Sequence, residues 1–161
     1  MAIKSTKSVE ALLKEKRISE IINPKLVQSA PDITIDQAVN LMLENKSGYI
    51  VIAKGKTVVG IFTETDFVRK VIDQNVDWKR PVSDFMTPEP KTLSPEDSVG
   101  QVIDLMGRYR FYHIPLVNDK NELVNVISVR TVIRFLAEFY PTEVYNLPPD
   151  PSQIMESAEG G

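Results

Sequence analysis

The chain has 161 residues, of which 42% are apolar and 25% charged, and its formal net charge is −3. This is the ordinary balance of a soluble globular protein, and a mildly acidic chain lacks the basic field that attracts nucleic acid. The sequence contains no cysteine, which excludes a disulfide framework, a thiolate zinc site and a cysteine nucleophile. Because it has neither the apolar region of a signal peptide nor a run of about 18 apolar residues, we expect a cytoplasmic protein that does not enter a membrane.

The first predicted element is a short amphipathic helix over residues 7–17. Val9, Leu12 and Leu13 fall on one side of this helix. We assign residues 1–17 as an N-terminal helical extension that precedes the repeated part of the chain.

Residues 18–80 predict a unit with the order strand, helix, strand, strand, helix. A short extended piece ends at Pro31, and Thr34 is a suitable N-cap for a helix that begins at Ile35. The hairpin turn between the two later strands contains Gly55. The two later strands and the second helix are expected at residues 49–53, 57–62 and 66–72.

Residues 81–140 repeat this order at an offset of 64 residues, which becomes 65 after the loop near Asn118. Ser98 takes the place of Thr34 as a helix N-cap. The later strands and the second helix are expected at residues 113–117, 122–127 and 131–139. A three-stranded unit of this size has a small core, so we expect the repeats to pack sheet to sheet as one α+β body with pseudo-two-fold symmetry. The tail, residues 141–161, is rich in proline and is expected to be extended.

The order of motifs, doubled at a fixed offset, resembles a tandem CBS-domain pair, also called a Bateman module. The resemblance covers roughly residues 18–138. It rests on the Ser-acid openings that end at Pro24 and Pro88, the helices with Met42 and Met106, the strand over residues 113–117 and the run from Gly60 to Asp66. The resemblance implies a regulatory, ligand-sensing module, similar to the stand-alone CBS-pair proteins, that binds an adenosine nucleotide (AMP, ADP or ATP) or S-adenosylmethionine between its repeats.

The same resemblance implies that the run from Gly60 to Asp66 contacts the ribose and the first phosphate. A carboxylate at a helix start can accept hydrogen bonds from both ribose hydroxyls, and the Thr63 hydroxyl with free helix N–H groups suits a phosphate. Gly60 lets the backbone approach closely, and the base is expected against Ile61. The alternative is that Thr63, Thr65 or Asp66 only caps the second helix, and one residue can do both.

The second repeat departs from this pattern. Asn125 stands in place of the glycine, and Thr131 stands in place of the acidic residue. A single hydroxyl cannot match a carboxylate as the acceptor for a diol. We therefore expect the second site to be degenerate and the chain to bind one nucleotide.

Further contacts to the intact site are implied from the other repeat. Pro90 and Lys91 are implied to reach the edge of the base and the phosphates, and Tyr112 and His113 to point toward the phosphates. Arg130 is a cation in the first turn of a helix, which is unfavourable with the helix dipole unless an anion lies nearby. The alternative for Arg130 is that its side chain is solvated. The alternative for His113 is that it is a structural residue on a strand. The basic residues of the helix-to-strand connections, Lys46, Arg108 and Arg110, are expected to be solvated; the alternative is that they add positive charge near the cleft. The predicted nucleotide-binding set is Gly60, Ile61, Thr63, Thr65, Asp66, Pro90, Lys91, Tyr112, His113 and Arg130.

We expect no enzymatic activity, no metal site and no required cofactor. The run from Gly55 to Thr57 lacks the upstream glycine of a P-loop, since residue 50 is isoleucine. One histidine and scattered carboxylates offer no obvious acid–base pair. The inosine monophosphate dehydrogenases that contain CBS pairs use a cysteine nucleophile on a barrel, and this chain has neither.

The expected partners are an adenosine nucleotide, a second copy of the chain and an unidentified protein regulated in trans, and not nucleic acid or a membrane. A homodimer is expected because the second helices of the two repeats have apolar residues in excess of what one small body buries. These residues are Phe67, Val71, Val132, Leu136 and Phe139. Two alternatives remain: a ligand-free dimerisation or adaptor module, which the degenerate second repeat favours, and a sensor of S-adenosylmethionine, whose positive sulfonium does not need Arg130.

Overall fold

The structure is a computed structural model that describes residues 8–139, so the predicted C-terminal tail and residues 1–7 lie outside the described residues. In chain order its elements are α1 (Val9–Glu15), the 3₁₀ turn η1 (Ile18–Glu20), β1 (Gln28–Ser29), α2 (Ile35–Glu44), β2 (Tyr49–Lys54), β3 (Thr57–Thr63), the short helix α3 (Glu64–Asp66), the π-helical turn η2 (Phe67–Ile72), the 3₁₀ turn η3 (Val82–Asp84), β4 (Thr87–Pro88), α4 (Val99–Tyr109), β5 (His113–Val117), β6 (Leu123–Ser128) and α5 (Val129–Phe139). The predicted helices and later strands of both repeats are present. The first strand of the second repeat is reduced to an isolated parallel bridge between Leu93 and Leu116.

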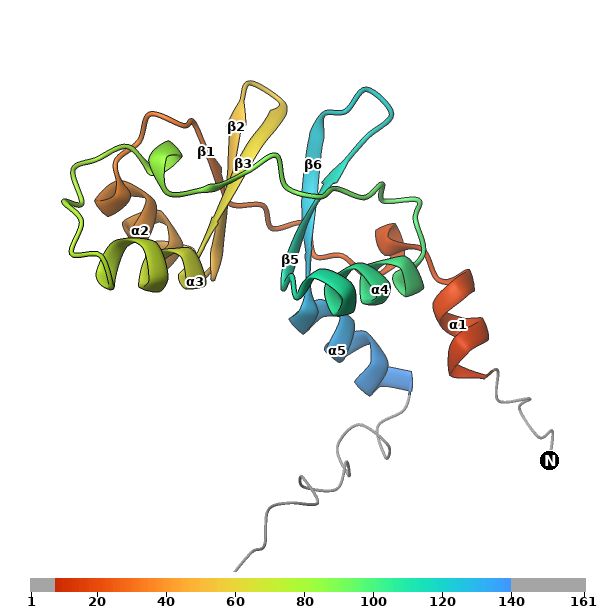
Figure 1. Cartoon of the computed structure of the whole chain (residues 1–161). Coiled ribbons are helices and arrows are strands. Elements are labelled where there is room, and N and C mark those ends of the chain that lie inside the picture. The colour runs from red at the N-terminus through yellow and green to blue at the C-terminus, as the bar shows by residue number, and fades with distance from the viewer. Residues whose placement is uncertain (1–7, 140–161) are drawn as a thin grey trace, which may run out of the picture.

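The strands form two sheets, one in each half of the molecule. The first has the order β1-β2-β3-β4, in which β1 is parallel to β2 and the other neighbours are antiparallel. The second sheet is the antiparallel hairpin β5-β6. Figure 1 shows the two hairpins side by side at the centre, with α2 and α3 outside the first and α4 and α5 beside the second. The predicted α+β fold with two repeats is confirmed.

Capping boxes begin the first helix of each repeat. The backbone N–H of Thr34 donates to Gln37 Oε1 at 3.0 Å, and that of Ser98 donates to Gln101 Oε1 at 2.8 Å. Ser98 Oγ in turn accepts from the Gln101 N–H at 3.2 Å. These bonds satisfy N–H groups that have no partner within the helix. Both predicted N-caps are thereby confirmed.

Two contacts join the hairpins of the two repeats directly. At the hairpin turns, the Leu123 N–H donates to the Lys56 carbonyl oxygen at 2.7 Å. At the opposite ends of the strands, the Tyr49 and His113 rings lie 4.9 Å apart, measured between their centroids. The relative position of the repeats is therefore fixed at both ends of the central strands.

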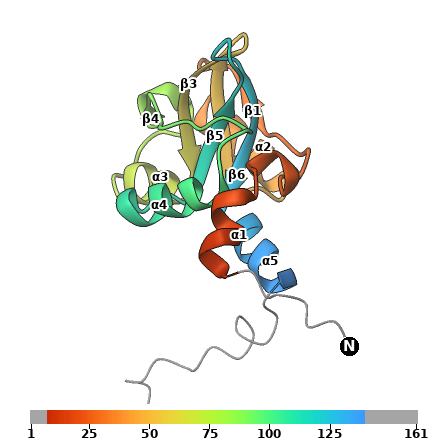
Figure 2. The ribbon, with the colours of Figure 1, turned by 90° about the vertical axis from the view of Figure 1, so that its right-hand side faces the viewer.

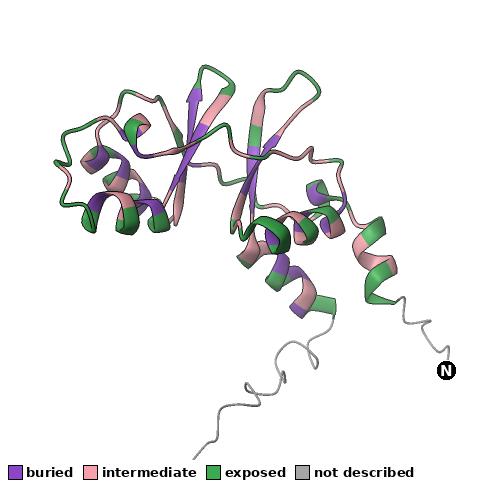
Figure 3. Cartoon of the chain, viewed as in Figure 1, coloured by how far each residue is buried: buried purple, intermediate pink, exposed green. Residues whose placement is uncertain are grey.

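Each repeat contributes its opening segment to the core of the other. Val82 and Phe85, which open the second repeat, are buried with the first repeat's Ile35 and Phe62. Ile18, which opens the first repeat, is buried in the core of the second. Figure 3 shows the buried residues concentrated on the strands and on the inward faces of the helices in both halves. The predicted boundary between residues 80 and 81 separates the sequence repeats, but the packing units cross it.

The helix α1 is an addition to the second half of the molecule. Leu12 and Leu13 pack against the second core, as the predicted apolar side of this helix requires. The prediction was wrong for Val9, which is exposed. Gly100 on α4 lets the two helices approach, because a Cβ atom there would lie 3.3 Å from the Leu13 carbonyl oxygen. Figure 2 shows α1 close to α4 and α5 below the sheets.

The apolar residues that we expected to be surplus on the second helices are partly in the cores. Val71 and Val132 are buried, which corrects that expectation. The exposed apolar residues on these helices are Val68, Ile72, Ile133 and Phe139, each close to half exposed. Among residues 8–139, no helix is long and apolar enough to cross a lipid bilayer.

Candidate ligand site between the repeats

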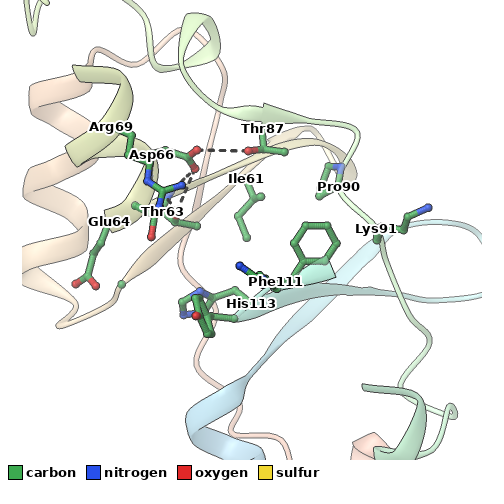
Figure 4. A pocket seen from close by; sticks show the side chains of 14 residues that line it. Ile61, Thr63, Glu64, Asp66, Arg69, Thr87, Pro90, Lys91, Phe111 and His113 are labelled. Carbon is green, nitrogen blue, oxygen red and sulfur yellow. Dashed lines mark hydrogen bonds between the residues drawn. The ribbon is translucent and has the colours of Figure 1, made fainter. Parts of the chain in front are cut away.

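A cavity of about 620 Å³ lies where the two repeats meet. This volume falls in the range of small-molecule sites, roughly 300–1,000 Å³. Its lining comes from the end of β3 and the start of the following helix in the first repeat, and from residues 87–91 and the loop before β5 in the second. The lining residues are Gly48, Ile61, Thr63, Glu64, Thr65, Asp66, Arg69, Thr87, Pro90, Lys91, Arg110, Phe111, Tyr112 and His113. In Figure 4, Ile61 and Phe111 lie between Asp66 at one end and Lys91 at the other.

The structure brings together most of the predicted nucleotide-binding residues. Those that line the cavity are Ile61, Thr63, Thr65, Asp66, Pro90, Lys91, Tyr112 and His113. Gly60 and Arg130 do not line it. The residues therefore converge from both repeats, as the resemblance implied, while their role in binding stays a prediction.

Asp66 and Thr63 form a capping box at the start of α3. The Thr63 N–H and Oγ1 both contact Asp66 Oδ2, at 3.0 and 3.1 Å, and the Asp66 N–H donates to Thr63 Oγ1 at 3.3 Å. Thr63 and Asp66 therefore do cap the helix, as the alternative to ligand binding proposed. The same bonds hold the buried Asp66 carboxylate at the cavity wall, so capping and ligand binding are compatible.

The other oxygen of Asp66 has two partners outside the capping box. Lys70 Nζ lies 2.7 Å from Asp66 Oδ1, and the Thr87 hydroxyl donates to the same oxygen at 3.4 Å. The contact with Thr87 is drawn as a dashed line in Figure 4. The carboxylate thus connects the start of α3, the π-helical turn η2 and strand β4.

Gly60 has a packing role that the sequence did not indicate. A Cβ atom at this position would lie 2.2 Å from Met86 Sδ and 2.8 Å from Met86 Cγ. The lack of a side chain makes room for Met86, which packs against the first core. This packing is sufficient to require glycine here, while a contact between a ligand and the Gly60 backbone stays a prediction.

His113 is a neutral side chain at physiological pH. Burial, with a further contribution from the positive charge of Arg130, lowers the pKa of His113 from 6.5 to about 4. A neutral imidazole can donate one hydrogen bond and accept another. Before a ligand binds, the neutral His113 can therefore offer a hydrogen bond, while the exposed Arg130 influences the site from outside the cavity lining.

Several lining residues were not predicted as part of the site. Arg110 was expected to be solvated; it ends α4 in the left-handed conformation, with φ 57°, and lines the cavity. Arg69 follows Asp66 by three residues, and both line the cavity. Thr87 and Phe111 adjoin predicted segments, and Glu64 lies inside the predicted run from Gly60 to Asp66, whereas nothing in the sequence pattern marked Gly48. The positive lining residues are Arg69, Lys91 and Arg110, and the only carboxylate among the lining residues besides Asp66 is that of Glu64.

The corresponding positions of the second repeat are occupied by internal hydrogen bonds. Asn125 is buried; its Nδ2 donates to the Asn23 carbonyl oxygen at 2.8 Å, and its Oδ1 accepts from the Val126 N–H at 2.8 Å. Thr131 accepts or donates at 3.1 Å with Ser128 Oγ, which also accepts from the Thr131 N–H. The second repeat therefore keeps a side-chain cap at the start of α5 but has no carboxylate there. No cluster of three or more potential metal-ligating side chains occurs in the part of the chain that the structure describes.

Comparison with known proteins gives several CBS-domain proteins among the relatives and structural neighbours. The chain is 34% identical over 122 residues to the CBS domain-containing protein CBSX3, mitochondrial, of Arabidopsis thaliana, covering 72% of this chain and 59% of the plant protein. Its fold matches the CBS domain protein PAE2072 from Pyrobaculum aerophilum complexed with AMP, with a TM-score of 0.71, 25% identity and coverage of 78% and 98% of the two chains. It also matches the CBS domain pair of protein MJ0100 in complex with 5-methylthioadenosine and S-adenosyl-L-methionine, with a TM-score of 0.69, 21% identity and coverage of 75% and 99%.

The family assignment rests on both repeats. The CBS domain family model matches residues 18–73 and again residues 82–138, which together are more than half of the chain. Both matches include the elements that wall the cavity: the end of β3 in the first repeat and the loop before β5 in the second. The protein belongs to the CBS-domain family and contains a tandem pair of these domains.

Proposed function

We propose that this protein is a regulatory module that binds one adenosine nucleotide in the cavity between its CBS domains. One observation carries the proposal: the buried carboxylate of Asp66 is held at the wall of a ligand-sized cavity whose other charged residues are mainly basic. An aspartate at a helix start suits a ribose diol, and basic side chains suit phosphate. The AMP complex of the Pyrobaculum aerophilum relative supports the choice of ligand class.

Each part of the nucleotide has residues of matching chemistry. Ile61 and Phe111 offer apolar surface for the base, and Asp66 offers acceptors for the ribose hydroxyls. Arg69, Lys91 and Arg110 supply positive charge for phosphates. CBS-pair proteins are generally regulatory and non-catalytic, and we assign this chain the same kind of role, without an enzymatic step.

The signal is proposed to pass through a second copy of the chain or a protein partner. Val68, Ile72, Ile133 and Phe139 are exposed apolar side chains on the second helices of both repeats. Burying such a surface favours association, and we infer a homodimer that acts on a separate protein. Sedimentation equilibrium tests the dimer: a monomeric mass at micromolar concentration would contradict it.

S-adenosylmethionine is a second candidate ligand. Glu64 places a carboxylate in the cavity lining, and a carboxylate can stabilise a positive sulfonium. The CBS domain pair of protein MJ0100, which has a similar fold, was crystallised in complex with S-adenosyl-L-methionine. The basic side chains favour a phosphate, so we rank the adenosine nucleotide first.

The experiment is a thermal unfolding screen with AMP, ADP, ATP, GTP and S-adenosylmethionine. A ligand at about 100 times its Kd stabilises the folded state by about 2.7 kcal/mol. At this chain length each kcal/mol raises Tm by roughly 2–4 °C. We expect a rise with an adenosine phosphate and a smaller one, or none, with GTP.

Two aspartate variants connect the shift to the site. Asp66→Asn keeps a helix-capping side chain but removes the charge, and it is expected to abolish the ligand-induced rise in Tm. Asp104→Ala is the matched control, because Asp104 is also paired with a basic residue four positions later, Arg108 at 3.0 Å, and does not line the cavity. No shift with any ligand in the folded wild type would instead favour the ligand-free adaptor.

A further inference from the structure

The hydrogen-bonding capacity of Asp66 is full before any ligand binds. A carboxylate offers about four lone-pair positions. Oδ2 accepts from the Thr63 N–H and Oγ1, at 3.0 and 3.1 Å, and Oδ1 contacts Lys70 at 2.7 Å and Thr87 at 3.4 Å. A ribose diol that binds here must therefore replace at least one existing contact. The longest, and hence the weakest, is the one from Thr87.

Lys70 contacts this carboxylate from outside the cavity lining, with its side chain partly exposed. Its Nζ bridges Asp66 Oδ1 and the carbonyl oxygen of Phe85, the latter at 3.1 Å. Phe85 is buried in the first core, although it belongs to the opening segment of the second repeat. Lys70 does not line the cavity, whereas Thr87 does. The ammonium group is therefore fixed between two acceptors, and the hydroxyl of Thr87 occupies the side from which a ligand enters.

We propose that Lys70 is a positioning residue for ribose recognition: by bridging Asp66 to the Phe85 carbonyl, it holds the carboxylate in place while a ribose hydroxyl replaces Thr87. This inference rests on the proposed function and adds a determinant of ribose selectivity to it. The π-helical turn η2 is part of the same device, since it presents Lys70 one turn after Asp66. π-helical turns are rare and often occur at functional sites.

The test is calorimetric titration of AMP, ADP and ATP, each beside its 2′-deoxy counterpart, into wild type and variants. Lys70→Met removes both bonds of the ammonium, and Lys70→Arg keeps a cation that can bridge two acceptors. We expect Lys70→Met to weaken binding of the ribonucleotide about tenfold and to reduce the preference for ribo over 2′-deoxy ligand toward that of Asp66→Asn. Lys70→Arg should restore most of both. Thr87→Val removes the hydroxyl that competes with the ribose for Asp66, and it should raise ribonucleotide affinity.

A matched control separates this effect from the loss of a surface ion pair. Lys79 pairs with Asp36 at the same 2.7 Å, outside the cavity lining, so Lys79→Met should change neither affinity nor selectivity. Weaker binding by Lys70→Met with an unchanged ribo-to-deoxy ratio would show a merely structural lysine and overturn the inference, as would no effect at all. A wild type that binds but does not distinguish the two sugars would also overturn it, while leaving nucleotide binding standing. A wild type that binds none of the ligands would overturn the proposed function and this inference together.

Discussion

His113 makes stability depend on pH in a range where few other groups titrate. Its pKa is lowered to about 4 in the folded protein, chiefly by burial and also by Arg130, against 6.5 for an unperturbed histidine. Between these pH values the unfolded chain takes up a proton that the folded chain does not. The free energy of unfolding is therefore expected to be flat above about pH 6.5 and to fall as the pH decreases toward 4.

The variant His113→Gln isolates this contribution, because the sequence has one histidine. Glutamine does not titrate, so the dependence on pH between 6.5 and 5 should become shallower than in the wild type. Urea unfolding at fixed ionic strength measures it, and the range stops at pH 5 so that carboxylates contribute little. Equal slopes for the two proteins would show that His113 is not the group responsible.

At the scale of elements, the pairing of β3 with β4 depends on Gly60. The register places Gly60 opposite Pro88 and Ile61 opposite Thr87, and Met86 fills the space over the glycine. Gly60→Ala forces a Cβ atom to within 2.2 Å of the Met86 sulfur. Overpacking of this kind costs about 1–3 kcal/mol, which chemical denaturation should detect as a lower midpoint.

Gly107→Ala is the control for this substitution. Gly107 lies in α4, and a Cβ atom there would contact nothing within 4 Å, so alanine should stabilise by about 0.5–1 kcal/mol.

Combining Gly60→Ala with Met86→Ala should cost less than the sum of the single changes, because the two side chains compete for one space. Strict additivity would argue against a clash with Met86 as the cause.

Elements whose ends depend on local chemistry could be predicted from the sequence, and those that depend on tertiary contacts could not. Thr34 and Ser98 cap their helices as expected because a capping box involves residues three apart. Residues of the π-helical turn η2 were expected to form an ordinary helix. In η2 a backbone N–H donates to the carbonyl oxygen five residues earlier, as that of Asp73 does to Val68 at 3.0 Å. The apolar pattern of the sequence does not distinguish this spacing from the four-residue spacing of an α-helix. The first strand of the second repeat reads like its counterpart, yet only Leu93 makes a bridge.

The site could be predicted as far as the family resemblance extends. The resemblance identified the segments that wall the cavity, so Asp66, Lys91 and His113 were found together. It said nothing of Lys70, whose role depends on the carbonyl of Phe85 fifteen residues later. Charge alone likewise left Arg110 as a solvated residue, because the left-handed turn that brings it to the cavity is not readable from the sequence.

At the scale of the whole molecule, the exchange of opening segments makes the two repeats one folding unit. The Ile18 N–H donates to the Asp97 carbonyl at 3.0 Å, and the Val82 N–H donates to the Ile33 carbonyl at 2.8 Å. Each repeat thus needs the opening residues of the other to complete its core. The sequence repeat shows which residues occupy equivalent positions, but it does not predict which of the two cores each residue packs in.

Unfolding is therefore expected to be a single transition. A core substitution in one half should lower the unfolding midpoint of both halves. Ile18 is fully buried in the second core, and Ile18→Ala should cost about 2–5 kcal/mol. The chain has one tryptophan, Trp78, whose ring lies 5.0 Å from Phe67 of the first repeat, so its fluorescence reports on the other half. If the halves unfold together, the midpoints from Trp78 fluorescence and from far-ultraviolet circular dichroism coincide in wild type and fall equally in the variant. A Trp78 midpoint that stays at the wild-type value while the dichroism midpoint falls would mean that the first repeat folds independently, and the exchanged segments would then be additions to two separate cores.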